Sequence, residues 1–120
     1  MAGTVTVEEE THGTIKKIKW SWTSTAGGDA DKITTGAFSG KILGLCTVPD
    51  GVDAPTVDYD VAIQDEDGID VLMGGGANRH NANTEYVLST SLGAVAYDKL
   101  NLIITDGGDT KKGTVYLFIR

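Results

Sequence analysis

Apolar and polar residues alternate with a period of two along much of the chain. In residues 14–23, Ile18, Trp20 and Trp22 fall on one side of an extended segment, and lysine and serine residues fall on the other. Residues 113–119 repeat the pattern with aliphatic residues on one side and two aromatic residues on the other, which predicts a strand covered on both faces. This periodicity is typical of β-strands that contribute one face to a core. We therefore expect strands, not helices, to dominate the fold.

Eight segments have the pattern or composition of a strand. Gly36, Gly40 and Gly44 interrupt the third of them, which predicts either one bent strand or two short ones. The Asp-Glu-Asp-Gly sequence of residues 65–68 predicts a hairpin turn, and the Asp, Gly and Thr residues between the last two segments predict a second hairpin. Leucine and valine residues in the range 88–95 fit a short helix as an alternative. The predicted strands are residues 4–8, 14–23, 33–48, 59–63, 69–73, 84–89, 100–105 and 113–119.

Short strands separated by turn residues at this spacing predict the fold class. The expected fold is all-β, an antiparallel two-sheet sandwich with a jelly-roll-like arrangement. A length of 120 residues fits a single domain over residues 1–120 with one core of its own. Three segments rich in Gly, Pro, Asn or Asp are expected to be loops, namely residues 24–31, 49–57 and 74–83. The order of the strands does not follow from these patterns.

The charge of the chain argues against several kinds of partner. The net charge is −7, and residues 33–110 hold twelve acidic residues against three basic ones. Such a surface repels phosphate backbones, so we expect no nucleic acid partner. No apolar run approaches the roughly 18 residues of a membrane span, and the N-terminus has no signal-peptide pattern, so we expect no membrane partner. The basic cluster of Lys16, Lys17 and Lys19 is interpreted as a solvated strand face, with a polyanion site as the alternative.

None of the motifs tested for chemistry is complete. Asp65, Asp67 and Asp70 surround Gly68, but their spacing does not match a calcium loop of the EF-hand type, so we expect a turn without a bound metal. The two histidines have no partner at zinc spacing, and no serine lies in a nucleophile elbow. We therefore expect no catalytic residues, no cofactor and no enzymatic activity. The single cysteine, Cys46, cannot form an internal disulfide, and its apolar neighbours predict a buried, unreactive thiol.

Trp20 and Trp22 allow two interpretations. Two indole rings on one strand face could stack on a sugar, or they could fill the core of a small sandwich. We favour the core because aromatic residues make up only 7% of the chain, so large side chains are scarce.

Three stretches of the sequence together resemble a known group of proteins. Residues 3–20, residues 59–79, and residues 92–102 with residues 113–120 are similar to small virion proteins of tailed bacteriophages. Small β-sandwich proteins of such virions typically decorate or cement the capsid. The resemblance therefore implies a homo-oligomeric decoration protein that binds the major capsid protein on the capsid surface of the virion, after synthesis in the host cytoplasm. A neck or tail component, or a carbohydrate-binding module that uses the tryptophan pair, is the alternative.

Two Gly-rich loops are the candidates for contacts with the capsid. Binding groups tend to lie on loops that a rigid scaffold holds in place. Arg79 lies among Gly and Asn residues with no acidic residue beside it in sequence, which favours an intermolecular contact. The predicted contact residues are Gly27, Gly28, Asn78, Arg79, His80 and Asn81.

Overall fold

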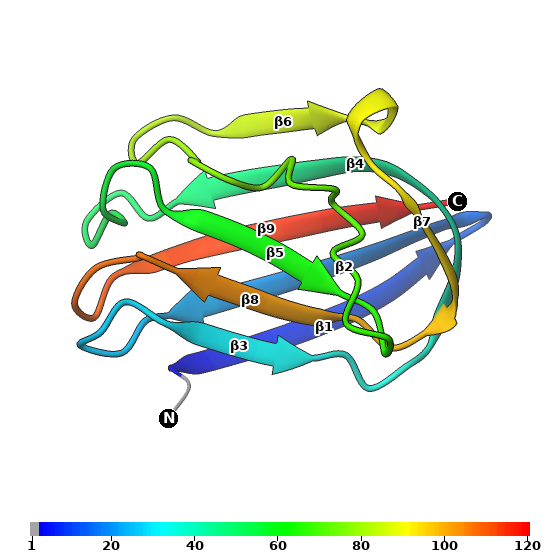
Figure 1. Cartoon of the computed structure of the whole chain (residues 1–120), viewed down its shortest axis with the longest axis horizontal. Helices are drawn as coiled ribbons and strands as arrows, with labels where there is room; N and C mark the ends of the chain where they lie inside the picture. The colour runs from blue at the N-terminus through cyan, green and yellow to red at the C-terminus, as the bar shows by residue number, and fades with distance from the viewer. Residues whose placement is uncertain (1–2) are drawn as a thin grey trace.

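The computed structural model describes residues 3–120, which form an almost purely β molecule (Figure 1). Among these residues the single helical element is a one-turn 3-10 helix, η1 (Ser89–Ser91). No helix in this part of the chain has the length and apolar character needed to cross a membrane. The strands are β1 (Thr4–His12), β2 (Ile15–Thr23), β3 (Ala30–Ile33), β4 (Phe38–Pro49), β5 (Asp60–Gln64), β6 (Glu85–Leu88), β7 (Ala94–Asp98), β8 (Asn101–Thr105) and β9 (Lys112–Ile119).

The strands form two antiparallel sheets that pack face to face. The larger sheet has the order β1-β2-β9-β4-β6, with β7 paired to β4, and the smaller sheet has the order β3-β8-β5. The smaller sheet lies in front of the larger one in Figure 1. Early strands pair with late ones, as β2 does with β9, β3 with β8 and β4 with β7. A long hairpin that rolls up gives this nested pairing, so the predicted all-β, antiparallel two-sheet, jelly-roll-like sandwich is confirmed.

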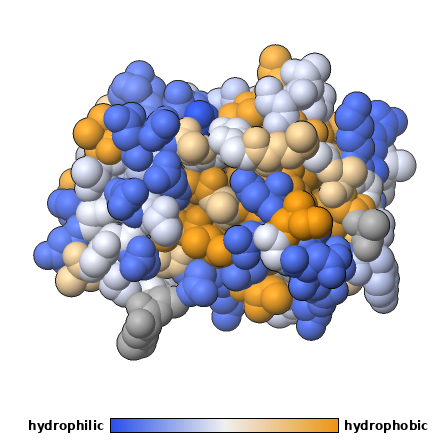
Figure 2. All heavy atoms as spheres, viewed as in Figure 1, coloured by the Kyte–Doolittle hydropathy of each residue, from blue (hydrophilic) through white to orange (hydrophobic). Residues whose placement is uncertain are grey.

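The core fills the space between the sheets with the inward-facing residues of both. Trp20 and Trp22 are 0% and 2% exposed, so the prediction that they are core residues is confirmed. The indole N–H of Trp20 donates to the carbonyl oxygen of Lys32 (3.2 Å), and the Trp22 ring packs on Tyr59 with centroids 5.6 Å apart. Neither ring is available to stack on a sugar. On the outside, polar side chains cover most of the face seen in Figure 2, with apolar patches between them.

Of the predicted segment of residues 33–48, one long strand forms, β4, and its pairing with β9 is irregular between Ile42 and Gly44. That is the predicted bent strand; Ile33 alone belongs to β3, in the other sheet. The hydroxyl of Thr34 lies between β3 and β4, where it donates to the carbonyl oxygen of Gly36 (2.8 Å) and accepts from the N–H of Leu100 (3.0 Å). These bonds stabilise the turn that carries the chain from β3 to β4. The alternation did not predict β7, because a bulge interrupts its pairing with β4 and Tyr97 has a φ of 57° there.

The predicted strand over residues 69–73 is wrong, although its turn is present. The N–H of Gly68 donates to the carbonyl oxygen of Asp65 (3.1 Å), which closes the turn. Beyond it, Asp70 makes only an isolated bridge to Gln64, and turns follow. The carboxylate of Asp70 accepts the N–H groups of Leu72 (3.0 Å) and of Gly74 (3.0 Å). Those side-chain bonds compete with a strand ladder and curl the chain instead.

The predicted hairpin at the C-terminal end is also wrong, although both of its strands exist. β8 pairs with β3 and β5, whereas β9 pairs with β2 and β4. The turn residues between them therefore carry the chain from the smaller sheet to the larger one. The physical reason is that both strands have a fully apolar face, with Leu102 and Ile104 on β8 and Val115 and Leu117 on β9. Placing the strands in opposite sheets lets these faces meet across the core.

Candidate functional site

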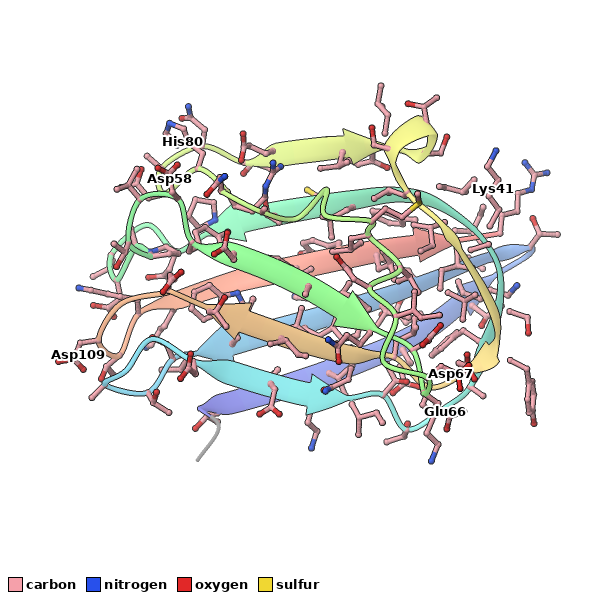
Figure 3. All side chains as sticks on the ribbon, viewed as in Figure 1. Lys41, Asp58, Glu66, Asp67, His80 and Asp109 are labelled. Atoms are coloured by element: carbon pink, nitrogen blue, oxygen red, sulfur yellow. The ribbon has the colours of Figure 1, made fainter. Side chains whose placement is uncertain are left out.

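The loops at one end of the sandwich form a continuous surface, the loop end. It consists of residues 24–29, 50–59, 77–84 and 106–111. The N–H of Gly107 donates to the carbonyl oxygen of Gly28 (2.9 Å), and the N–H of Thr56 donates to the carbonyl oxygen of Gly107 (3.0 Å). The N–H of Arg79 donates to the carbonyl oxygen of Tyr59 (2.7 Å). The labelled histidine and two of the labelled aspartates in Figure 3 lie at this end. These bonds join its loops into a rigid surface.

The structure brings the predicted contact residues of both loops to this same end. Gly27, Asn78 and His80 are exposed, and Asn81 is half-buried. Gly28 is buried and has a φ of 90°, and a side chain there would collide with the backbone of the 106–111 loop. Gly27 is therefore the accessible member of that pair. Contact with a capsid stays a prediction for all of them.

Arg79 is held by its own chain, which its sequence neighbourhood does not reveal. Its side chain is 17% exposed, and its Nη1 atom lies 3.5 Å from Oε1 of Glu85. Its Nε and Nη2 groups donate to the carbonyl oxygen of Ala77 (3.2 and 3.1 Å). The same Glu85 oxygen accepts the N–H of His80 (2.7 Å). Arg79 and Glu85 thus fix the shape of the loop that carries the exposed residues.

The outer face of the larger sheet carries a row of three aromatic side chains, which we call the aromatic row. Its members are Tyr86, Phe118 and Tyr116. The ring centroids of Tyr86 and Phe118 are 6.3 Å apart, and those of Phe118 and Tyr116 are 6.4 Å apart, with interplanar angles of 22° and 7°. The Nζ atoms of Lys17 and Lys19 lie 5.4 and 5.8 Å from the Tyr116 centroid. Two of the clustered lysines therefore make cation–π contacts and do not form a free basic patch.

The aromatic row depends on a glycine and includes the only cysteine at its margin. A side chain at Gly44 would collide with the Tyr86 ring, so glycine lets that ring lie against the sheet. Cys46 is paired in register with both Tyr86 and Tyr116. It is half-buried, so the expectation of a buried thiol is wrong. Partial desolvation still raises the pKa of Cys46, which keeps the thiol protonated and unreactive.

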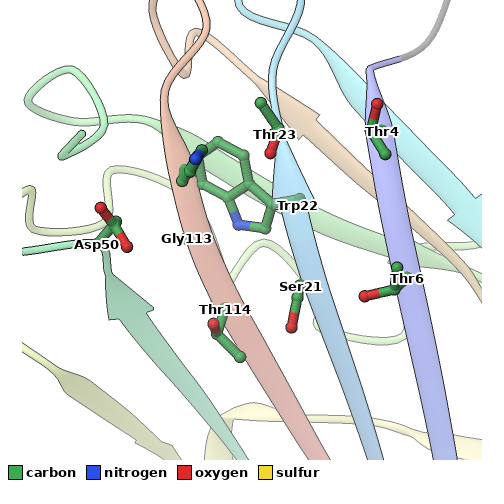
Figure 4. Close-up of a pocket in the computed structure, with 9 residues that line it drawn as sticks. Thr4, Thr6, Ser21, Trp22, Thr23, Asp50, Gly113 and Thr114 are labelled. Atoms are coloured by element: carbon green, nitrogen blue, oxygen red, sulfur yellow. The ribbon is translucent and has the colours of Figure 1, made fainter. Parts of the chain in front are cut away.

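A groove of about 280 Å³ lies on the larger sheet next to the loop end (Figure 4). Strand register arranges much of its lining in two cross-strand rows over β1, β2 and β9. The carboxylate of Asp50 lies at the end of β4, beyond β9 in Figure 4. The lining residues are Thr4, Thr6, Ser21, Trp22, Thr23, Asp50, Lys112, Gly113 and Thr114.

Carboxylates gather at the end of the sandwich opposite the loop end, where Figure 3 labels Glu66 and Asp67. Oxygens of Asp65, Asp67 and Asp98 lie within 4.8 Å of one another, a grouping that could hold a metal ion. The turn sequence identifies the first two residues, but Asp98 arrives from β7. Asp65 already accepts the N–H groups of Asp67 (2.9 Å) and of Ile69 (3.0 Å), as expected of a turn. The turn accounts for the positions of Asp65 and Asp67 without an ion, so this cluster carries no metal assignment.

Comparison with known proteins adds distant structural similarity. No family model matches the sequence, and no curated protein matches it. A solved structure from work on the promiscuous specificity of carbohydrate-binding modules of the β-sandwich superfamily is similar, with 17% identity and a TM-score of 0.39. The similarity covers 98% of this chain and 52% of that one, so this chain spans about half the length of that protein.

Proposed function

We propose that the protein is a non-catalytic component of a bacteriophage virion, a decoration protein that binds the major capsid protein on the surface of the assembled head as a homo-oligomer. The resemblance of residues 3–20, 59–79, 92–102 and 113–120 to small phage virion proteins supports the phage assignment. The structure of the loop end is the observation that supports a role in attachment to the capsid. Two loops more than 40 residues apart in sequence meet there, linked by backbone hydrogen bonds through a third and a fourth loop.

A rigid loop end suits attachment to a repeating shell. Loops that are already ordered lose little conformational entropy on binding, so modest contacts give useful affinity. Several such contacts per oligomer add through avidity, without one large interface. The loop end exposes several aspartates, among them Asp58 and Asp109 (Figure 3), so the complementary capsid surface is expected to be basic.

The test mixes the purified protein with capsids that lack it and images the particles by electron cryomicroscopy. Density over the shell is expected, and density only at the neck or tail would favour that alternative placement. Gly27→Arg should abolish attachment because it adds a bulky cation to an exposed position with room for a side chain. Glu66→Arg, which places the same side chain at the opposite end with a larger charge change (+2 against +1), is the control and should attach normally. Attachment that survives Gly27→Arg would contradict a role for the loop end.

A carbohydrate-binding module is the second candidate, and the aromatic row is the observation that favours it. Near-parallel rings on an exposed sheet face offer apolar surface to the flat face of a sugar, whereas the buried tryptophan pair cannot. Tyr116→Ala should then abolish binding to immobilised glycans. Tyr97→Ala, which removes an exposed tyrosine from another part of the molecule, should leave binding unchanged.

A further inference from the structure

The groove beside the loop end has an unusual concentration of free hydroxyl groups. Strand register places Thr6, Ser21 and Thr114 in one cross-strand row. The adjacent row holds Thr4, Thr23 and Lys112. Within residues 3–120, none of the five hydroxyls makes a hydrogen bond to the protein, so each is free to donate and to accept.

Two charged groups complete the lining. One oxygen of Asp50 accepts the N–H groups of Asp53 (2.8 Å) and of Val52 (3.1 Å), which fixes the orientation of its carboxylate. These bonds lower the pKa of Asp50, so the group is ionised at neutral pH. The Nζ atom of Lys112 lies 3.8 Å from Asp53, at the rim. The groove therefore offers a fixed acceptor, a cationic donor and an array of hydroxyls.

This chemistry selects a class of ligand. An anion would be repelled by Asp50, and a cation would be repelled by Lys112, so a neutral ligand fits best. Five free hydroxyls match a ligand that itself carries many hydroxyls. The volume of about 280 Å³ is near the lower end for small-molecule sites, which suits one sugar ring and not a large cofactor.

The aromatic row extends the groove along β9. Tyr116 follows Thr114 by two residues, so both side chains leave the same face of the sheet. Lys19 is paired in register with Tyr116. It precedes Ser21 by two residues on β2, so both of these side chains also leave the same face of the sheet. A chain of sugars that begins among the hydroxyls would therefore reach the Tyr116 ring at its next position and would stack there in place of the Lys17 and Lys19 ammonium groups.

We propose that the groove binds one ring of a neutral oligosaccharide through Asp50 and the Thr6–Ser21–Thr114 row, while the neighbouring ring stacks on Tyr116. This inference rests on the second candidate function, because it assigns a site to a carbohydrate-binding module. It is independent of where the protein sits on a virion.

The test measures binding of maltohexaose, cellohexaose, xylohexaose and mannohexaose by isothermal titration calorimetry. The groove variant is Thr6→Val with Thr114→Val, which keeps shape and strand propensity but removes two hydroxyls. At least one sugar should bind, and the groove variant should bind it roughly tenfold or more weakly. Thr105→Val, an exposed position on the smaller sheet, is the matched control and should bind normally. Ser21→Ala provides a second groove variant should the first fail to fold.

Three results separate the possibilities. Loss of affinity in the groove variant and in Tyr116→Ala, with the control unchanged, supports the proposal. Loss in Tyr116→Ala alone overturns the groove and leaves a carbohydrate-binding module that uses only the aromatic row. Binding of none of the four sugars by the parent protein overturns both the groove and the second candidate function.

Discussion

Glu9 shows how a single carboxylate can hold two parts of the chain together. One of its oxygens accepts the N–H (2.9 Å) and the hydroxyl (2.8 Å) of Thr35, and the other accepts the N–H of Gly36 (2.9 Å). Partial burial acts to raise the pKa of Glu9, but the bonds from Thr35 and Gly36 outweigh it, so the pKa is lowered. Glu9 thus ties β1 to the turn between β3 and β4.

Glu9→Ala is expected to lower the free energy of unfolding by about 1–2 kcal/mol at pH 7, a value reduced for solvent exposure. Because the pKa of Glu9 is lower in the folded state, its contribution to the free energy of unfolding is fully present above the unfolded-state pKa. That contribution is lost as the pH falls through the folded-state pKa. The difference from the parent should therefore shrink below about pH 4. Urea unfolding at several pH values measures it. Glu8→Ala, on the opposite face, should change stability by less than about 0.5 kcal/mol.

Asp98 presents the opposite case. Partial desolvation and the neighbouring Glu66 raise its pKa, with a smaller contribution from Asp65. The protonated form is therefore favoured in the folded state, and stability associated with this group increases as the pH falls through the raised pKa. Asp98→Asn should raise the melting temperature at pH 7, and the gain should vanish in acid.

Millimolar calcium should leave the melting temperature of the parent protein unchanged. A calcium-dependent rise that Asp98→Asn abolishes would instead identify the carboxylate cluster as a cation site.

At the scale of elements, the pattern of apolar residues predicts a strand correctly where burial of one face determines that pattern. It fails where side chains form hydrogen bonds with the backbone groups that a strand would use. The faces of β2 follow from alternation because one side of the strand lies in the core. The same is true of the aliphatic face of β9, but its aromatic face is half-buried and not covered as predicted. The turn at residues 65–68 also follows from its sequence. The strand after it does not form, because Asp70 bonds to backbone groups that a ladder would need. Nothing in the apolar pattern of Ile69 to Met73 distinguishes the two outcomes.

Asp70→Ala should therefore destabilise the segment that replaces the predicted strand. The substitution leaves the N–H groups of Leu72 and Gly74 without their acceptor, which should cost about 1–2 kcal/mol. Amide hydrogen exchange should accelerate at these two residues more than elsewhere, because the loss is local. Asp31→Ala, at an exposed position on β3, should affect neither stability nor exchange. Equal exchange rates in parent and Asp70→Ala would show that the bonds have no stabilising role.

At the scale of the whole molecule, the candidate sites depend on strand order, which the sequence pattern does not contain. Tyr86 and Phe118 are 32 residues apart, and their rings meet only because β6 and β9 both flank β4. Arg79 and Glu85 are near in sequence, yet their ion pair requires the intervening loop to fold back. The hydroxyl rows of the groove need the register of three strands. The contact loops are predictable as loops, but their meeting at one end follows from the nested pairing.

The shared core leads to a last prediction about cooperativity. Leu102 lies in the smaller sheet and Leu117 in the larger one, and both are fully buried in one cluster between the sheets. Neither sheet can bury its apolar face without the other, so the molecule should unfold as one unit. Leu102→Ala and Leu117→Ala should each cost about 2–5 kcal/mol. In both variants the transitions seen by far-ultraviolet circular dichroism and by tryptophan fluorescence should coincide. Both tryptophans belong to the larger sheet, so separate transitions in Leu102→Ala would mean that the smaller sheet unfolds by itself.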